Sequence, residues 1–277
     1  MQKNYQHNNI SDQLKTFTRV WGNPTDNKAV ICLVHGLGEH IGRYEHFAKF
    51  FTDNNIAVIA SDLRGHGQSE GTRGDAKSYN ILLEQVDDLL QQADKYFPNL
   101  PKFIYGHSMG GNIALAHALS RQIKVNGIIL SAPFLEPGTP IPAVKFMAGK
   151  LIGSIWGAFR LPNGLALDKL SRSPEVAAKY SSDPLVHDQI SARWFFPAYQ
   201  IGKDALSNIK TQLQSPMLIM HGSADGLTSF EASKKLAAQN PAMVTFKEWT
   251  GFYHELHNEP EQREVFQYTL AWIHAKM

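Results

Sequence analysis

The sequence contains a single cysteine, and this scarcity excludes a fold held together by internal disulfide bonds. Cys32 is the only cysteine among 277 residues. A lone thiol is typical of a protein from a reducing compartment, so we expect a cytoplasmic location. Because Cys32 lies in an apolar run, we interpret it as a small buried hydrophobic residue rather than as a reactive thiol.

Long apolar runs and an excess of charge of one sign are also missing. No stretch has the length of uninterrupted apolar residues that a membrane span requires. Residues 1–10 are polar and lack the apolar core of a signal peptide. The 27 Lys and Arg residues and 25 Asp and Glu residues leave a formal net charge of +2, without a basic stripe. We therefore expect no nucleic acid as a partner, whereas peripheral contact with a membrane stays open.

Apolar runs of strand length alternate with segments of helical spacing through most of the chain. With 43% hydrophobic residues, a chain of this length can bury one large core. The alternation predicts an α/β fold, with a mostly parallel central sheet flanked by helices. The expected strands are 14–21, 29–34, 56–60, 102–105, 125–130, 216–220 and 243–249, and the expected helices are 44–54, 79–97, 112–119, 229–238 and 260–275.

The alternation stops for about seventy residues, and this interruption predicts an insertion. Residues 134–205 lack a strand pattern, so we expect a helical cap between two parts of one core, 1–133 and 206–277. Within the insertion, residues 143–159 are strongly apolar, which indicates an apolar substrate. An equally weighted alternative is that this apolar helix simply packs on the core.

Ser108 lies on a turn between a predicted strand and a predicted helix. Gly106 and Gly110 flank it at a spacing of two residues on either side, which is the G-x-S-x-G pattern. Such a turn forces the backbone of the serine into a tight conformation, so its neighbours can carry almost no side chain. The turn exposes the hydroxyl and places the N–H of Met109 at a helix start, where a negative charge is favoured. We therefore predict that Ser108 is a catalytic nucleophile.

A second glycine-containing turn follows the predicted strand 29–34. Gly36 and Gly38 allow the backbone to approach whatever lies at the carboxyl edge of the sheet. We expect the N–H groups of Leu37 and Met109 to form an oxyanion hole beside Ser108.

A serine hydroxyl needs a base, and the base needs a carboxylate that fixes its tautomer. Asp225 and His254 follow the last two predicted strands, so the chain order is Ser, Asp, His, as in α/β hydrolases. His257 lies nearer the start of the terminal helix, and His221 is better placed to shape the loop of Asp225. We therefore predict that Asp225 is the acid and His254 the base.

The motifs together resemble those of the monoacylglycerol lipase and lysophospholipase group of the α/β-hydrolase superfamily. They are His35-Gly36-Leu37-Gly38-Glu39-His40, Arg43-Tyr44, Asp62-Leu63-Arg64-Gly65-His66-Gly67-Gln68-Ser69, Gly106-His107-Ser108-Met109-Gly110-Gly111, Gly222-Ser223-Ala224-Asp225 and Tyr253-His254. The resemblance implies a nucleophile at Ser108, an acid at Asp225, a base at His254, and oxyanion donors at Leu37 and Met109. It also implies a small lipid ester as substrate, with no cofactor and no metal.

Three alternatives remain open at this point. The first is a short-chain carboxylesterase or a thioesterase, and the second is a hydrolase-like protein that binds a ligand with little turnover. Dehalogenases and epoxide hydrolases of similar fold carry a carboxylate where this chain has Ser108, so they are disfavoured.

The third idea concerns the apolar stretch 143–159, which is also a candidate for contact with membranes or micelles. The sequence does not predict the oligomeric state.

Overall fold

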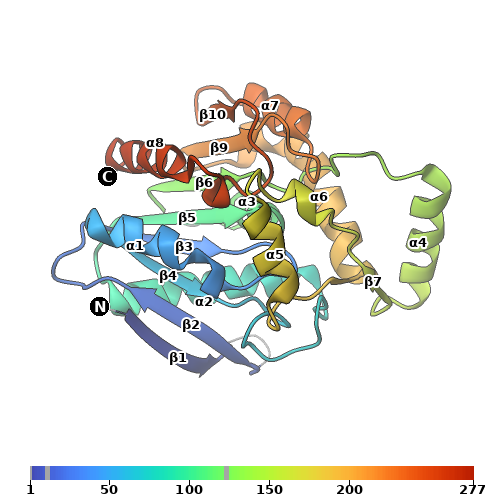
Figure 1. The fold of residues 1–277 in the computed structure, drawn as a ribbon, viewed down its shortest axis with the longest axis horizontal. Coiled ribbons are helices and arrows are strands. Elements are labelled where there is room, and N and C mark those ends of the chain that lie inside the picture. Colours follow the sequence, from blue (N-terminus) through green and yellow to red (C-terminus); the bar gives the residue numbers. More distant parts are fainter. Residues whose placement is uncertain (1, 10–12, 122–124) are drawn as a thin grey trace.

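A computed structural model describes residues 2–9, 13–121 and 125–277, and its centre is an eight-stranded sheet (Figure 1). The strand order is β1-β2-β4-β3-β5-β6-β9-β10. All neighbours from β4 to β10 run parallel, whereas β2 is antiparallel to β4 and β1 is antiparallel to β2. The strands are β1 (Gln2–Asn8), β2 (Lys15–Trp21), β3 (Ala29–Val34), β4 (Ile56–Ser61), β5 (Lys102–His107), β6 (Gly127–Ser131), β9 (Met217–Gly222) and β10 (Val244–Trp249).

The predicted strands are all present, and the sheet has one strand more than the sequence pattern indicates. The additional strand, β1, lies at the edge of the sheet and carries mostly exposed polar side chains. It pairs with β2, with Gln2 opposite Trp21 and Asn8 opposite Lys15. An exposed edge strand needs no apolar face, so hydrophobic periodicity could not identify it.

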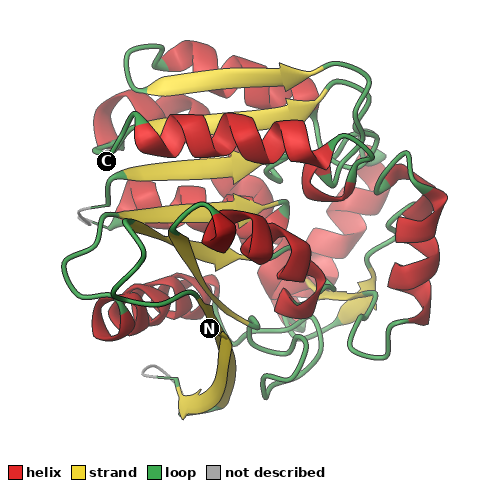
Figure 2. Ribbon diagram, turned by 60° about the vertical axis from the view of Figure 1, so that its left-hand side comes forward, coloured by secondary structure: helices red, strands yellow, loops and turns green. Residues whose placement is uncertain are grey.

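Helices cover both faces of the sheet, as the alternating pattern predicts (Figure 2). One face carries α1 and α8, and the other carries α2, α3 and α7. Each face has its own buried apolar cluster, and the central strands β3 and β4 contribute alternate residues to the two clusters. The helices are α1 (Glu45–Asp53), α2 (Tyr79–Tyr96), α3 (Met109–Ser120), α7 (Phe230–Gln239) and α8 (Gln262–His274), and the 3₁₀ turn η1 (Ile41–Tyr44) precedes α1.

The terminal helix begins later than the sequence predicts. We expected Pro260 in its first turn, but α8 starts at Gln262 and Glu261 is its N-cap residue. The turn η3 (Leu256–Asn258) occupies the chain just before this start. None of the helices in the described part of the chain is long and apolar enough to cross a membrane.

The insertion leaves the core after β6 and returns to it through one long helix. Its elements are α4 (Ala143–Ile155), β7 (Arg160–Pro162), the 3₁₀ turn η2 (Leu167–Lys169), α5 (Pro174–Ser182), β8 (Gln189–Ser191) and α6 (Ala192–Gln212). The insertion is mainly helical, as expected, and β7 and β8 add a short antiparallel sheet that the sequence pattern does not indicate. The expected border between residues 205 and 206 falls inside α6, which packs against α3 and α7 of the core.

Helix α4 stands away from the body of the molecule (Figure 1). It packs on α6 through Phe146, whose ring meets those of Phe196 and Tyr199. None of its residues is buried, and Val144 and Ile155 are 83% and 82% exposed. The alternative in which this apolar helix packs on the core is therefore wrong.

Candidate active site

The turn that carries Ser108 has the strained geometry that the glycine pattern predicts. Ser108 lies between the end of β5 and the start of α3, with φ of 54° and ψ of −118°. A left-handed φ is rare for a residue with a side chain and costs energy that the surroundings must supply. A Cβ atom on Gly106 would lie 2.5 Å from the carbonyl oxygen of Gly110, so neighbouring segments are too close for a larger residue.

Ser108 and His254 line one small cavity at the carboxyl edge of the sheet. The cavity has a volume of about 20 Å³. The strand ends supply one part of its wall and the insertion supplies the rest. The lining residues are Gly36, Leu37, Glu39, His107, Ser108, Leu165, Leu170, Tyr180, His254 and Glu255. Two of the predicted catalytic side chains therefore meet at one site, beside residues of the insertion.

The carboxylate of Asp225 binds the imidazole of His254 directly. His254 Nδ1 donates to Asp225 Oδ2 at 2.7 Å, and both side chains are almost completely buried. The other carboxylate oxygen accepts the N–H groups of Leu227 at 2.7 Å and Thr228 at 3.1 Å. These bonds fix the carboxylate, which in turn fixes the ring of His254 with Nδ1 protonated. Nε2 of that ring is then the nitrogen that is free to accept a proton.

His221 shapes this site as the sequence predicts. Its Nε2 donates to Asp225 Oδ2 at 3.0 Å, while Nδ1 lies 2.8 Å from Ser233 Oγ. Thr228 was not predicted, although its hydroxyl donates to the same carboxylate oxygen at 2.9 Å. A threonine three residues after an aspartate has no distinctive sequence signal, so only the fold identifies it.

The electrostatics of the pair suit a base and its orienting acid. Burial would raise the pKa of Asp225, but the charge of His254 and the bonds from His221 and His254 hold this pKa well below its usual value. Burial would likewise lower the pKa of His254, but the charge of Asp225 and its hydrogen bond raise this pKa above the ordinary value. The neighbouring His107 has no such partner, and burial lowers its pKa to about 3. Of these two histidines, His254 is thus the one that can take up a proton near neutral pH.

The predicted oxyanion donors come from two segments that meet beside Ser108. Met109 is the first residue of α3, so its N–H has no carbonyl partner within the helix. Leu37 lies on the loop after β3 and lines the same cavity as Ser108. A Cβ atom on Gly36 would lie 3.3 Å from the Cβ of Ser108, which shows how closely this loop approaches the turn.

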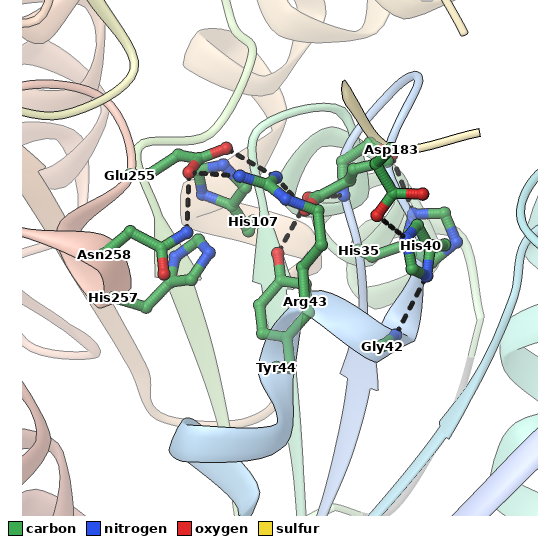
Figure 3. A network of polar contacts seen from close by, with 12 residues as sticks. His35, His40, Gly42, Arg43, Tyr44, His107, Asp183, Glu255, His257 and Asn258 are labelled. Carbon is green, nitrogen blue, oxygen red and sulfur yellow. Dashed lines mark hydrogen bonds and ion pairs between the residues drawn. The ribbon is translucent and has the colours of Figure 1, made fainter. Parts of the chain in front are cut away.

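A buried group of charged side chains extends from the wall of the cavity, where Glu39 and Glu255 lie, to Arg43, and Figure 3 shows Arg43 and Glu255. Glu39 and Arg43 belong to the motifs of the family resemblance, but the sequence does not indicate that they form a group with Glu255. Arg43 donates two bonds of 2.7 Å to Glu255 and one of 2.8 Å to Glu39. Among the described residues, one set of potential metal ligands lies close together, namely Glu39, Glu255 and His257. The guanidinium group of Arg43 bonds both carboxylates of that set and supplies the positive charge there.

Comparison with known proteins agrees with this geometry. The profile of the family described as serine aminopeptidase, S33, matches residues 25–261. A monoacylglycerol lipase of Mycolicibacterium smegmatis is 33% identical over 256 residues, which cover 92% of this chain and 91% of that protein. An uncharacterised abhydrolase domain-containing protein of Dictyostelium discoideum is 34% identical over 269 residues, which cover 95% of this chain but 28% of that protein.

A crystal structure of a monoacylglycerol lipase of Paleococcus ferrophilus superimposes with a TM-score of 0.86 at 30% identity, covering 95% of this chain and 99% of that one. These matches confirm the resemblance that the sequence motifs indicate. The chain therefore belongs to the serine aminopeptidase S33 family, and it is a serine hydrolase with the α/β-hydrolase fold.

Proposed function

We propose that this enzyme hydrolyses a fatty-acyl ester of a small lipid, a monoacylglycerol or a lysophospholipid, through an acyl-enzyme on Ser108. The observation that carries the proposal is the hydrogen bond from His254 to Asp225, with His254 and Ser108 lining one cavity. The similarity to monoacylglycerol lipases along nearly the whole chain supports the lipid substrate.

The proposed reaction has two steps with the same base. Ser108 Oγ attacks the acyl carbonyl carbon while His254 Nε2 takes its proton, and the N–H groups of Leu37 and Met109 stabilise the oxyanion. The protonated His254 then gives the proton to the departing alcohol oxygen as the ester bond breaks. In the second step His254 Nε2 takes a proton from a water molecule, whose oxygen attacks the acyl carbonyl carbon. The bond between that carbon and Ser108 Oγ then breaks, His254 returns the proton to Ser108 Oγ, and the fatty acid leaves. No step uses a cofactor or a metal ion.

The small size of the cavity supports a second candidate function. A volume of about 20 Å³ holds little more than one water molecule, so a fatty-acyl chain enters only if the insertion moves. A short-chain carboxylesterase or thioesterase needs less space. The exposed apolar side chains of α4 favour the long-chain substrate, because an apolar helix face can bind a membrane or micelle, in which long-chain lipids reside.

A substrate panel tests the proposal. We expect the highest kcat/KM on long-chain monoacylglycerols or lysophospholipids, and we expect fluorophosphonate labelling that disappears in Ser108→Ala. An optimum on acetyl or butyryl esters supports the short-chain candidate instead. Absence of labelling in the wild-type protein, or equal labelling of Ser108→Ala, contradicts the acyl-enzyme.

We also propose that the enzyme is cytoplasmic and meets lipid surfaces through α4. Exposed apolar side chains follow one another along this helix and past its end, among them Met147, Leu151 and Trp156 at 69%, 65% and 61% exposure. Lys145 and Lys150 are its only charged residues and are exposed, so they can contact anionic headgroups.

Co-sedimentation with vesicles of phosphatidylcholine and phosphatidylserine tests this contact. We expect the double variant Val144→Glu, Ile155→Glu to lose vesicle binding while its melting temperature stays close to that of the wild type, because both side chains are exposed. Equal sedimentation of variant and wild type argues against the contact.

A further inference from the structure

Three charged side chains connect the two loops on which the proposed chemistry depends. Glu39 and Glu255 line the cavity, and Arg43 lies between them and binds both; Figure 3 shows Arg43 and Glu255. We propose that the ion triad of Glu39, Arg43 and Glu255 positions the oxyanion loop relative to the loop of His254. The inference rests on the proposed function, because it assigns roles to groups that serve the reaction there. None of the three side chains is a reacting group, so each is a positioning residue.

Glu39 holds the oxyanion loop from within. Its Oε1 accepts the N–H of Gly36 at 2.6 Å and the hydroxyl of Tyr44 at 2.8 Å. Gly36 immediately precedes Leu37, the proposed oxyanion donor. A Cβ atom on Gly36 would lie 2.8 Å from that same carboxylate oxygen, so the carboxylate lies directly against the loop and leaves no room for a side chain at this position. A shift of Glu39 therefore moves the backbone next to the donor.

Arg43 carries this connection across to the other loop. It binds Glu39 Oε2 with the same nitrogen that binds Glu255 Oε1, and its second terminal nitrogen binds Glu255 Oε2. Glu255 is the residue after His254, and its own N–H donates to the carbonyl of Leu170 at 2.7 Å. The guanidinium group thus fixes the distance between a side chain that bonds the oxyanion loop and the residue next to the proposed base.

The burial of the triad argues for a role beyond stability. The side chains of Glu39 and Glu255 are 3% and 2% exposed, and that of Arg43 is 10% exposed. Removing charges from water is costly, and apolar residues of the same volume often stabilise a protein at least as well as a buried ion pair. The ion pairs contribute a fixed orientation of the side chains, because a planar guanidinium group holds carboxylates in a defined geometry.

The variant Arg43→Lys distinguishes the effect of the positive charge at position 43 from the effect of its hydrogen-bond geometry. Lysine keeps the positive charge but cannot donate the paired bonds, so the link between the loops loosens. We expect kcat to fall by about 10- to 100-fold, as for small misplacements of catalytic groups. We expect KM to stay within about 3-fold, since substrate contacts are unchanged.

Arg193→Lys is the matched control. Arg193 binds both carboxylate oxygens of Asp75 and joins the insertion to the core, but neither residue lines the catalytic cavity. The control loses a paired arginine–carboxylate contact of the same kind, so we expect a changed melting temperature with kcat near the wild-type value.

Glu39→Gln provides a second variant in case Arg43→Lys loses its cooperative thermal transition. The amide oxygen of the introduced side chain can still accept the N–H of Gly36, but its NH₂ group then faces Arg43, so the same link breaks from the other side. If the three residues act as one unit, the double variant Glu39→Gln, Arg43→Lys should lose no more kcat than the worse single variant.

The outcomes separate this inference from the proposed function. Suppose that the wild type is labelled and turns over substrate, and that both single variants have the same kcat as Arg193→Lys. This result overturns the positioning role and leaves the proposed function intact. Losses in kcat that simply multiply in the double variant also overturn it. If the wild type itself is not labelled at Ser108, the proposed function has failed, and with it the basis of the inference.

Discussion

Replacing Asp225 by asparagine tests the proposed catalytic arrangement with the smallest change in shape. The introduced amide can keep its oxygen where the N–H groups of Leu227 and Thr228 point, since both donate to Oδ1 of the aspartate. The amide NH₂ group then occupies the position of Oδ2, which in the wild type accepts from His254. Two donors cannot face each other, so the imidazole of His254 must accept at Nδ1 and carry its proton on Nε2. In that tautomer it cannot take a proton from Ser108.

The expected loss is large because the wrong tautomer removes the base rather than weakening it. A change of this kind costs roughly 10⁴-fold in kcat in a serine protease. At 1.36 kcal/mol for each factor of ten, this corresponds to about 5 kcal/mol of transition-state stabilisation. Protein stability should fall by much less, about 1–3 kcal/mol, because the buried side chain keeps its bonds to the backbone.

The acidic limb of the pH–rate profile provides a second readout. The charge of Asp225 raises the pKa of His254 above its ordinary value, so in the wild type kcat/KM should decline on acidification at a pH above about 6.5. His107, Glu255 and Glu39 also face this ring and are unchanged in the variant. Residual activity of Asp225→Asn should therefore persist to lower pH than that of the wild type.

The assay is ester hydrolysis with the rate of fluorophosphonate labelling measured in parallel, and thermal unfolding checks the fold. Asp87→Asn is a suitable control, because Asp87 accepts from His117 at the same distance of 2.7 Å in a pair between α2 and α3. A folded Asp225→Asn variant with kcat within about 10-fold of the wild type refutes the assignment of Asp225, since such a loss is far below that expected for a wrong tautomer.

Two further predictions concern the surroundings of the site. Gly110→Ala should lower the melting temperature and the yield of folded protein, because its Cβ would lie 2.2 Å from the carbonyl oxygen of Val34, a clash that typically costs about 1–3 kcal/mol or more. Gly149→Ala on α4, whose nearest contact would be at 3.4 Å, should leave the fold intact, and equal melting temperatures for the two variants would contradict the argument. Thr228→Val removes the hydroxyl that donates to Asp225 and keeps nearly the same side-chain shape at position 228. We expect the free energy of unfolding to fall by about 1–3 kcal/mol, and kcat to fall by less than in Asp225→Asn. Denaturant titration and steady-state kinetics check the second prediction, and an unchanged stability would contradict it.

The sequence was informative where local patterns control the structure. Buried parallel strands such as β3 are continuously apolar, and the glycines around Ser108 are required by the turn itself. Strands β1, β7 and β8 lack such a pattern, because β1 is an exposed polar edge and the other two have three residues each. The exposure of α4 also could not be predicted from the sequence, since apolar composition does not reveal whether other elements cover the helix.

In the site, the sequence located side chains at strand ends but not the contacts between distant residues. Ser108, Asp225 and His254 could be selected because each follows a strand and the chemistry requires their residue types. Arg43 and Glu255 lie 212 positions apart in the chain, and although Arg43 belongs to a family motif, no spacing pattern links it to Glu255. Only folding brings them together, so their burial could not be predicted from the sequence.

The two halves of the insertion are attached to the molecule very differently. The segment around η2 and α5 hydrogen-bonds to both catalytic loops, through Leu170 to Glu255 and through His187 to Gly38. Among the described helices and strands, α6 is the one against which α4 packs closely. No residue of α4 lines the cavity beside Ser108, so a helix of different composition could replace α4 without displacing the residues proposed for catalysis.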